Sequence, residues 1–562
     1  MSKKIPILLS LLLGAIVSGY LAAPRMIRSY AERRLPQGVE IQGPIRLGLD
    51  GIVLRDVVFN RGWVRGTLQE VTVISEESVD IRGGSVMVDL DLRTEEAATG
   101  QGTGGAPPVD TLTARGISAH GLGVTIQRGE EKAVLTGGSW DGTRACFQEG
   151  DVTSPRVFAH LIQSCYYRHN GDLTVGSGTV HLPQVPKIPG LDVPFLDGHI
   201  ENVRVTRRID DLYVQADRFD LGPLSGTEVS LSRVWADGLM YLDARTLTLA
   251  HPWLAPTPST FQDVHVSGAR NHTVRIFVGT QVGVEVNLDT QTIKGQAPCQ
   301  EWVRALPENL RVEPLSSLSF TGMLSFEAGL TPKPRMQMTA ACRASCQTFP
   351  KLRQMFSYQA YSTVGTRFER RTGPGTPVWL PIGAAGQVPL AVIQMEDPGF
   401  PSHRGYIAQA FQNSLIENVQ KGRFSRGGST ITQQTAKNLW LSRDKTLGRK
   451  VGELFLAQAL ESCLTKDEIL ETYLNIVEFG PNIYGLSEGA RHWFHKTPAE
   501  LTPVEAFWLA RILPAPRKAA APVAAVLHQT ERLMQNLARQ GRIPEFDSET
   551  EPADASEWDA TE

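Results

Sequence analysis

The sequence predicts a multidomain protein with a membrane helix, then a large and mostly antiparallel β region, then an all-α domain. Three observations predict this order. An uncharged apolar run lies near the amino terminus, apolar residues recur with period two over residues 39–349, and apolar residues recur three and four apart after residue 375. A chain of 562 residues is also too long for one ordinary domain, so at least two folded units are expected.

The apolar run at residues 5–23 is long enough for a membrane anchor. As a helix it spans about 28 Å, close to the roughly 30 Å hydrocarbon core of a bilayer. A cleaved signal peptide is the alternative, since two lysines give a basic start and Ala23 is small. Pro24, directly after the only plausible cleavage site, favours the anchor. We therefore expect an anchor and a juxtamembrane segment over residues 1–36.

The charges exclude one class of function and leave the orientation of the anchor open. A net charge of −3 offers no concentrated basic face for nucleic acid, so no nucleic-acid partner is expected. Four arginines follow the apolar run and two lysines precede it. Taken alone, the positive-inside rule would leave the body of the protein in the cytoplasm or undecided.

Six cysteines occur, without a CxxC pair or histidines at zinc-ligand spacing, so a zinc site is not expected. Cys463 lies in a helical pattern and is predicted to be a buried small hydrophobe. At least one further cysteine would then stay free or pair between chains. In an oxidising compartment the candidate disulfides are Cys146 with Cys165, and Cys342 with either Cys346 or Cys299.

The β region is expected over residues 37–349, with one buried face. Turn-forming residues at 60–62, 82–84 and 170–172 punctuate the apolar runs. Residues 94–108 (TEEAATGQGTGGAPP) lack periodicity and are expected to form a flexible loop within the region. The clearest period-two runs are Ile45/Leu47/Leu49, Val86/Val88/Leu90/Leu92 and Val282/Val284/Val286/Leu288, which is typical of antiparallel strands.

Helical spacing predicts an all-helical domain over residues 365–520. Thr465 with Glu468, and Thr502 with Glu505, form capping-box sequences at two helix starts. A further helix is expected over residues 521–544, and an acidic disordered tail over residues 545–562. The helices expected within the domain cover residues 405–420, 430–441, 447–463, 466–477, 487–494 and 503–513.

Four short motifs follow one another in the helical domain. They read EDPGFPSHRG from Glu396, RGGSTITQQ from Arg426, RKVGE from Arg449 and EILETYLN from Glu468. In this order and spacing they resemble the peptidoglycan glycosyltransferase domain of family 51, which is shared by monofunctional transglycosylases and the amino-terminal half of class A penicillin-binding proteins. The resemblance covers the last third of the chain and implies a lysozyme-like helical fold. No transpeptidase domain is predicted after Pro516.

The resemblance implies that a lipid-linked sugar is joined to a sugar hydroxyl. Because the leaving group departs as a stable pyrophosphate anion, the site needs cations to hold the developing charge and a base to take the proton of the hydroxyl. Glu396 matches the family's catalytic glutamate and is the predicted base. The alternative is that Glu396 and Asp397 only cap a helix or face solvent. By position in the motif, Asp397, Phe400 and His403 are expected to shape the loop, with Phe400 packed and His403 hydrogen-bonded.

A glycine pair followed by hydroxyl residues and a helix forms the predicted anion site. Free backbone N–H groups at a helix start point toward a negative ligand. An ordinary helix cap would explain Ser429 and Thr430 equally well. Thr435 replaces the family's usual aliphatic residue and is expected to bond within its own helix. The substrate-binding residues expected here are Gly428, Ser429, Thr430, Gln433, Gln434, Lys437 and Asn438, of which Lys437 could reach a pyrophosphate oxygen.

Arg449, Lys450 and Glu453 are spaced to share one helix face, which usually indicates a surface salt-bridge cluster. The resemblance implies instead that Glu453 is the second catalytic carboxylate and that Arg449 and Lys450 bind phosphate. Glu453 would assist the pyrophosphate end with or without a divalent cation, Mg or Mn, and no other cofactor is expected. Asn482 stands where the family usually has glycine and is expected to adopt left-handed backbone. The fourth motif contributes supporting residues, Glu471, Tyr473 and Asn475.

The β region is similar in texture to the groove-forming region of AsmA-like envelope proteins, which are associated with lipid handling. The similarity rests on segments such as GPIRL at residues 43–47 and SGTEVSL at residues 225–231. A structural spacer or a protein-docking domain explains the same pattern equally well.

Together these features predict a membrane-anchored peptidoglycan glycosyltransferase. It would polymerise lipid II into β-1,4-linked strands with inversion and release of polyprenyl pyrophosphate. The expected partners are lipid II, the growing glycan strand, the membrane and other cell-wall synthesis proteins. Because that chemistry takes place outside the plasma membrane, we expect a single-pass inner-membrane protein with its catalytic domain on the periplasmic side.

Two alternatives remain open at the level of sequence. The first is a lytic, lysozyme-like transglycosylase, which the pyrophosphate-binding motifs disfavour because a hydrolase has no use for them. The second is an inactive transferase-fold protein that binds lipid or acts as a scaffold. The presence of both Glu396 and Glu453 disfavours that second alternative.

Overall fold

The structure is a computed structural model that describes residues 38–48, 51–62, 64–75, 78–91, 117–155, 157–183, 196–208, 211–234, 239–252, 254–268, 272–329, 335–421, 428–520, 522 and 524–545. The chain divides into two compact units. Unit 1 comprises Met1–Leu249 and Asp263–Arg270, and unit 2 comprises Ala250–Gln262 and Asn271–Glu562.

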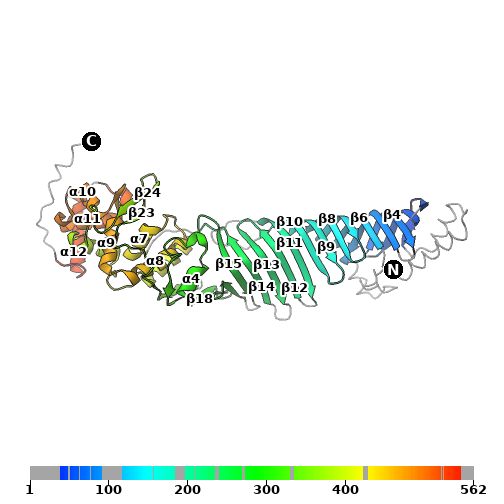
Figure 1. Ribbon diagram of the computed structural model, residues 1–562, viewed down its shortest axis with the longest axis horizontal. Helices are drawn as coiled ribbons and strands as arrows, with labels where there is room; N and C mark the ends of the chain where they lie inside the picture. The colour runs from blue at the N-terminus through cyan, green and yellow to red at the C-terminus, as the bar shows by residue number, and fades with distance from the viewer. Residues whose placement is uncertain are drawn as a thin grey trace. The chain divides into compact units, whose positions relative to one another are not determined.

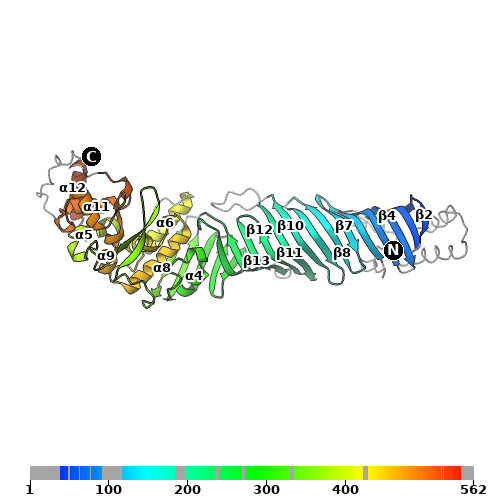
Figure 2. The same ribbon diagram turned by 45° about the horizontal axis from the view of Figure 1, so that its top comes forward.

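Unit 1 is a ladder of strands in which each strand from β3 onward pairs with the next along the chain (Figures 1 and 2). The β5–β6 pair is parallel, and the other pairs from β3 to β14 are antiparallel. The strands are β1 (Val39–Ile41), β2 (Ile45–Gly48), β3 (Gly51–Arg61), β4 (Val64–Ser75), β5 (Ser78–Asp89), β6 (Ile117–Arg128), β7 (Glu131–Trp140), β8 (Arg144–Thr153), β9 (Phe158–Tyr167), β10 (Asp172–Leu182), β11 (Leu196–Arg208), β12 (Asp211–Asp220), β13 (Leu224–Val234) and β14 (Leu239–Leu249). The predicted large and mostly antiparallel β region is confirmed.

Many strands of unit 1 contain a residue with left-handed backbone near their middle. The register passes over such a residue: Ile162 pairs with Ser177 and Ser164 pairs with Val175, so Gln163 is left unpaired in the β9–β10 register. Gly176 of β10 is passed over opposite it, so the register continues without a shift. The non-glycine examples in β3, β9, β11 and β13 are Asp56, Gln163, Asn202 and Glu228, with φ of 51°, 55°, 49° and 47°.

The turn that the sequence predicts at residues 82–84 is wrong. These residues lie inside β5, where Gly83 and Gly84 have φ of 67° and 128° and interrupt the strand without ending it. A Cβ atom at Gly84 would lie 2.4 Å from the carbonyl oxygen of Thr67 on β4. Glycine is therefore required here by the close approach of a neighbouring strand, which local sequence does not distinguish from a turn.

Unit 2 combines a small antiparallel sheet with the helices. Strand β15 (Ser259–Gly268) crosses the division between the units, and β16, β17, β18, β20 and β21 pair in that order. The elements are β16 (Thr273–Val278), β17 (Val282–Asn287), β18 (Thr292–Pro298), α4 (Cys299–Ala305), η2 (Glu308–Leu310), β19 (Phe320–Thr321), β20 (Met323–Gly329), β21 (Arg335–Ala340), β22 (Arg343–Ala344), β23 (Phe356–Tyr361), β24 (Arg367–Thr372), η3 (Ile382–Ala384), α5 (Val388–Glu396), α6 (Ala408–Lys421), α7 (Ile431–Trp440), α8 (Leu447–Cys463), α9 (Lys466–Ile476), β25 (Glu478–Gly480), β26 (Ile483–Tyr484), α10 (Leu486–Phe494), η4 (Pro498–Glu500), α11 (Pro503–Ile512), η5 (Pro516–Lys518) and α12 (Ala524–Arg539).

The helical prediction is confirmed for α6 to α11, within three residues at each end. Both predicted capping boxes form, because the side chains of Thr465 and Thr502 accept from the backbone N–H groups of Glu468 and Glu505. Helix α5 has no counterpart among the expected helices. Its first eight residues are almost all apolar and it is buried against α11, so it lacks the polar face that produces a helical period.

One hydrophobic core runs through unit 2 from the strands to the last helix. It includes Phe320 of β19, Tyr358 of β23, Phe455 of α8 and Met534 of α12. The rings of Phe320 and Phe455 meet edge to face with centroids 5.6 Å apart. The strands that precede the helical segment and the helices therefore stabilise one another.

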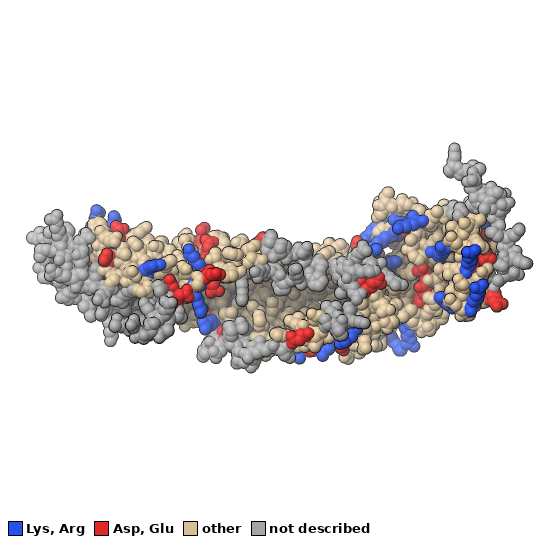
Figure 3. Space-filling model, turned by 180° about the vertical axis from the view of Figure 1, so that it is seen from behind, with Lys and Arg blue, Asp and Glu red and all other residues tan. Residues whose placement is uncertain are grey.

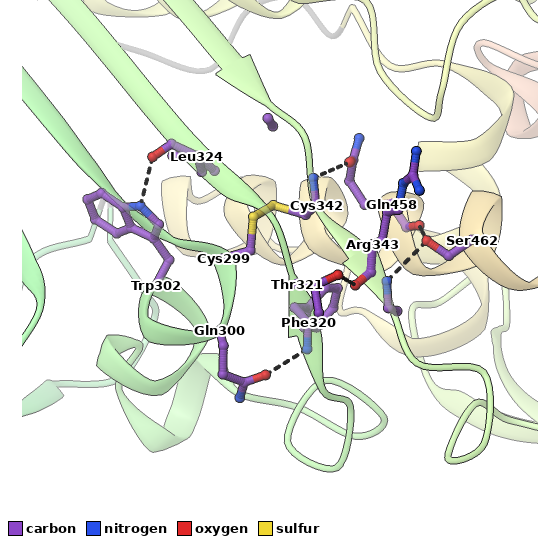
Figure 4. The surroundings of a disulfide bond; sticks show 12 residues. Cys299, Gln300, Trp302, Phe320, Thr321, Leu324, Cys342, Arg343, Gln458 and Ser462 are labelled. Atoms are coloured by element: carbon purple, nitrogen blue, oxygen red, sulfur yellow. Dashed lines mark hydrogen bonds between the residues drawn. A yellow bond between two sulfur atoms is a disulfide. The ribbon is translucent and has the colours of Figure 1, made fainter.

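Hydrogen bonds beside the Cys299–Cys342 disulfide attach α8 to the strands of unit 2 (Figure 4). Cys299 at the start of α4 bonds to Cys342, whose backbone N–H donates to Gln458 of α8 over 3.1 Å. The backbone N–H of Ala344 donates to the Ser462 hydroxyl of the same helix. The carboxyl end of α8 is thus held by residues more than a hundred positions earlier in the chain.

The cysteine pairing partly corrects the sequence analysis. Cys146–Cys165 is confirmed, and of the two partners considered for Cys342 the structure has Cys299. The assignment of Cys463 as a lone buried hydrophobe is wrong, because it pairs with Cys346 across 117 residues. No cysteine of the chain remains free, so the expected leftover thiol is wrong as well.

Several expectations fall outside the described residues, namely the apolar run at residues 5–23, the loop at residues 94–108 and the acidic tail after Glu545. No helix in the described part of the chain is long and apolar enough to cross a membrane. On the face shown in Figure 3, Lys and Arg side chains are interspersed with Asp and Glu side chains, in keeping with the nearly balanced net charge.

Candidate active site

Glu396 is the last residue of α5 and faces α7. Its Oε2 accepts a hydrogen bond of 2.7 Å from the side-chain amide of Gln434. Burial raises the pKa of the Glu396 carboxyl above its ordinary value, while the Gln434 hydrogen bond and the positive charge of Lys437 oppose that rise. A carboxylate with a raised pKa beside a cation can accept a proton near neutral pH, as a general base must.

Asp397 joins the loop after α5 to the first turn of α7. Its carboxylate is 2% exposed and accepts from the backbone N–H of Ile431 over 3.0 Å and from Nε2 of His403 over 2.8 Å. Since Nδ1 of His403 accepts from the Gly405 N–H, the proton of the neutral ring lies on Nε2. The carboxylate therefore stabilises the positive end of the helix and is engaged in structure.

Helix α7 begins with a complete capping box. The Thr430 hydroxyl accepts from the Gln433 N–H and donates to the Gly405 carbonyl, and the Gln433 side chain accepts from the Thr430 N–H. A Cβ atom at Gly428 would lie 2.7 Å from the carbonyl oxygen of Ala410 on α6, so only glycine fits there. The expected bond of Thr435 within its own helix is present, 2.9 Å from its hydroxyl to the Ile431 carbonyl.

A cluster of cations gathers between α7 and α8. Lys450 donates to the Ser429 hydroxyl over 2.5 Å and to Glu453 over 2.6 Å, and Arg449 forms an ion pair with the other oxygen of Glu453. Burial, together with the charges of Arg449 and Lys437, lowers the pKa of Lys450 to about 7. Burial, together with the charges of Arg449 and Arg443, lowers the pKa of Lys437 to about 8.

Lys437 lies near both the Glu396 carboxylate and the Arg449 guanidinium. Its charge interacts with Glu396 on one side and with Arg449 on the other, and among the described residues it has no hydrogen-bond partner. A partly buried cation without a bonded anion is a site for an anionic ligand, because such a ligand would restore the charge that burial disfavours. The arrangement therefore places the predicted base, Glu396, beside a group of cations that can bind an anion.

Glu453 is buried among these cations. Its side chain is 1% exposed, and its two oxygens contact Arg449 and Lys450. Across the described residues, no further His, Cys, Asp or Glu joins it in a group of three that could hold a metal ion. A single carboxylate that already pairs with two cations does not fit a divalent cation bound by the protein alone.

The three residues of the fourth motif support the site from α9. Glu471 accepts from the Trp379 indole over 2.7 Å and from the Ile382 N–H over 2.8 Å, and Asn475 exchanges two hydrogen bonds with the backbone of Leu380. Tyr473 is fully buried and donates to Gln434 over 3.0 Å. These contacts fix α9 against the segment that leads into α5.

A pocket of about 430 Å³ opens beside Gln434 and Lys437. Six of its lining residues are Lys or Arg and one, Glu478, is acidic, which suits a ligand with several negative charges. Tyr358 and Tyr361 of β23 form part of the wall. The basic lining residues are Lys437, Arg443, Lys445, Arg449, Arg517 and Lys518.

Sequence reasoning missed the network of ion pairs and hydrogen bonds in the wall of this pocket. Glu478 accepts from Arg443 over 2.8 Å and from Arg517 over 2.9 Å, and Arg517 also donates to the Tyr361 carbonyl over 2.8 Å. The Arg443 guanidinium lies 4.3 Å from the centre of the Tyr361 ring. These residues are far apart in the chain and belong to different elements, so no local spacing identifies them.

The structure brings most of the predicted site residues together. Gln434, Lys437, Asn438 and Arg449 line the pocket, and Ser429, Lys450 and Glu453 form the adjoining cluster. Gln433 is completely buried in the helix cap and Thr430 is the cap itself, so both lie away from the pocket lining. Phe400 is packed at 2% exposure under the Lys466 ammonium, 4.4 Å from its ring centre. Asn482 has the left-handed φ of 65° expected of it.

Comparison with known proteins agrees with this arrangement. A family model described as transglycosylase matches residues 382–539. The biosynthetic peptidoglycan transglycosylase of Pasteurella multocida is 41% identical over 167 residues, which cover 29% of this chain and 68% of the relative. Those of Aeromonas hydrophila and Nitrosomonas europaea are 43% and 42% identical over 157 and 153 residues, each match covering 27% of this chain. The matches cover 66% and 59% of those two relatives, and residues before 382 lie outside the family match.

Proposed function

Because the chain belongs to the biosynthetic peptidoglycan transglycosylase family, we propose that it polymerises lipid II into β-1,4-linked glycan strands. The observation that carries the proposal is the position of Lys437, which interacts with Glu396 and adjoins the Arg449, Lys450 and Glu453 cluster. A base and a polycationic pocket side by side suit a reaction in which a hydroxyl loses a proton and a pyrophosphate leaves.

In the proposed reaction, the 4-hydroxyl oxygen of the acceptor sugar attacks the anomeric carbon of the donor. The new carbon–oxygen bond forms as the bond to the pyrophosphate oxygen breaks, so the configuration inverts. The proton of the hydroxyl passes to Glu396, and the bonding electron pair leaves with polyprenyl pyrophosphate. Lys437 and Arg449, with Lys450 beside them, balance the negative charge that develops on the leaving oxygen.

Glu453 supports this reaction indirectly in the proposal. It is buried and bound to both Arg449 and Lys450, which share a helix and would otherwise repel each other. Held by one carboxylate, the two cations stay close together at the edge of the pocket. Its role is therefore to organise the anion site, and charge neutralisation is assigned to the side-chain cations.

Membrane attachment and location are part of the same proposal. Residues 5–23 would anchor the chain in the inner membrane, with the helical domain on the periplasmic side, where both lipid-linked substrates keep their tails in the bilayer. The three disulfides suit an oxidising compartment of this kind. Other cell-wall synthesis proteins are the proposed partners.

The test is polymerisation by the purified full chain. Wild type incubated with lipid II should yield long glycan strands on sizing gels, and Glu396→Gln should yield at least about a hundredfold less, as expected for loss of a general base. Glu327→Gln, an exposed glutamate on β20, is the matched control and should match wild type. Absence of polymer with wild type, or equal polymer with Glu396→Gln, would overturn the proposal.

A lytic activity is the competing function, because a glutamate with a raised pKa also suits a general acid in glycoside hydrolysis. The cationic pocket separates the two, since a neutral glycan offers it no phosphate. Incubation of the protein with preformed glycan strands should leave their length unchanged. Shortened strands from wild type but not from Glu396→Gln would establish the lytic function instead.

A further inference from the structure

A chain of two hydrogen bonds leads from a buried tyrosine to the proposed base. The Tyr473 hydroxyl on α9 lies 3.0 Å from Oε1 of Gln434 on α7, and Nε2 of Gln434 lies 2.7 Å from Oε2 of Glu396. Helix α7 packs against α9, so the three side chains belong to three elements that meet at one point. Tyr473 is 0% exposed, and no other hydrogen bond of its hydroxyl is found among the described residues.

These two hydrogen bonds fix the direction in which the Gln434 amide points. An ionised carboxylate only accepts hydrogen bonds, so the amide N–H must face Glu396 and the amide oxygen must face Tyr473. Tyr473 then has to donate. Burial raises the pKa of the Tyr473 hydroxyl well above its ordinary value, so this hydroxyl keeps its proton throughout the working range of pH.

We infer that Tyr473 is a positioning residue, which holds the Gln434 amide with its N–H toward Glu396 and so keeps the base ready to accept a proton. The inference rests on the proposed function of Glu396. Without the tyrosine hydroxyl, the amide oxygen would lose its donor and the amide could turn, presenting its oxygen to a protonated Glu396 just as well. The orientation that favours the ionised carboxylate would then be held for less of the time.

Other groups around Glu396 do not provide the same control. The charged groups that act on its carboxyl are Asp397, which follows it, and Lys437 from α7. Helix α11 packs against α5, yet within the described residues it brings no charged side chain to bear on this carboxyl. Among the described residues, only Gln434 donates a hydrogen bond to Glu396. Tyr473 is the residue that orients Gln434.

The test compares the pH dependence of kcat/KM in wild type and Tyr473→Phe. Loss of one hydrogen bond in the chain should lower kcat/KM roughly fivefold near the optimum and move the acid limb of the profile to higher pH. Tyr406→Phe is the matched control, because it also removes a hydroxyl with a hydrogen bond inside unit 2, here to the Ala340 N–H over 2.7 Å. It should lower thermal stability without moving the acid limb. An unmoved acid limb in Tyr473→Phe would overturn the inference.

A double-mutant cycle shows whether Tyr473 acts through Gln434. In a Gln434→Ala background, Tyr473→Phe should have no further effect on the acid limb. An additive effect of the two substitutions would overturn the inference.

Titration of the Glu396 carboxyl itself separates this inference from the proposed function. It is measured in the ¹³C-glutamate-labelled full chain, with Glu396→Gln to assign the signal. The titration midpoint of the Glu396 carboxyl should lie at higher pH in Tyr473→Phe than in wild type, even if no glycan is made. Equal midpoints would overturn the positioning role, whereas a missing polymer with shifted midpoints would overturn only the function.

Discussion

At the scale of single residues, the site works through charges that burial has made unstable. Glu396 has a raised pKa, while Lys437 and Lys450 have pKa values lowered to about 8 and 7. The two lysines are therefore close to losing the charge that the proposed reaction needs. An anionic substrate in the pocket would favour the protonated lysines again, so binding and charging are coupled.

The alkaline limb of the pH profile should follow these lysines. In the free enzyme, kcat/KM should fall first near pH 7 as Lys450 loses its proton, and further near pH 8 as Lys437 does. Lys450→Arg keeps its charge at these pH values and should delay the first fall to about pH 8. Steady-state kinetics from pH 5 to 10 measure both limbs. An alkaline limb that is identical in wild type and Lys450→Arg would contradict the assignment.

As pH rises, the same lysines should increase the stability of the folded chain while activity falls. A lysine whose folded-state pKa is depressed binds fewer protons in the folded chain than in the unfolded chain between that pKa and its ordinary value. The free energy of unfolding therefore gains a contribution as pH rises from about 7 toward 10, the range over which activity declines.

Chemical type and spacing allowed the candidate residues to be chosen, but not their roles. The motifs gave Glu396, Lys437, Arg449 and Lys450, which the structure brings together. They could not separate a residue that faces the pocket from one that holds a helix, because Thr430 and Gln433 stand in the same motif as Lys437 and yet form the cap of α7. The pocket wall made by Arg443, Glu478 and Arg517 depends on long-range packing alone.

At the scale of elements, α7 is the helix on which the site depends. It packs against α8, α9 and β23, carries Gln434 and Lys437, and is fixed at its start by its own cap and by Asp397. The pattern of apolar residues predicted this helix well. It failed for α5, because seven of its first eight residues are apolar and a helix without a polar face has no helical period to detect.

Removal of the α7 cap should cost both stability and activity. Thr430→Ala leaves the Gln433 N–H without its acceptor and should lower the free energy of unfolding by about 1–2 kcal/mol. Thr502→Ala removes the equivalent cap of α11, which supplies no pocket residue. Both variants should lose about 2–4 °C in Tm, and only Thr430→Ala should also lose polymerising activity. Equal activity in the two variants would show that the cap does not position the site.

At the scale of the whole molecule, the site belongs to a unit that begins well before the matched family region. Residues 382–539 match the family, yet β23 supplies Tyr358 and Tyr361 to the pocket and the hydrophobic core reaches back to Cys299. The sequence indicated where strands give way to helices. It could not show that the last strands and the helices share a core, because a change of periodicity marks secondary structure and does not mark a division between folded units.

The Cys346–Cys463 disulfide should stabilise unit 2. Replacement of both cysteines by serine should lower the free energy of unfolding by about 2–4 kcal/mol, since the bond closes a loop of 117 residues. Replacement of Cys146 and Cys165, which close a loop of 19 residues in unit 1, is the matched control and should leave the unfolding of unit 2 unchanged. Calorimetry of the full chain measures both. A unit 2 transition that is the same without Cys346–Cys463 would contradict this prediction.

The spacing of the cysteines in unit 2 also constrains how the protein is made. In the oxidising compartment that we propose for this protein, Cys299, Cys342 and Cys346 would be available for pairing before Cys463 is synthesised. Cys346 has to remain unpaired over that interval, although Cys342 is only four residues away, because a bond between them would leave Cys299 and Cys463 without their partners. Early closure of Cys299–Cys342 would prevent that wrong pairing. The Cys346–Cys463 bond, at the carboxyl end of the helix that carries Glu453, can form only once the 117 residues after Cys346 have been made.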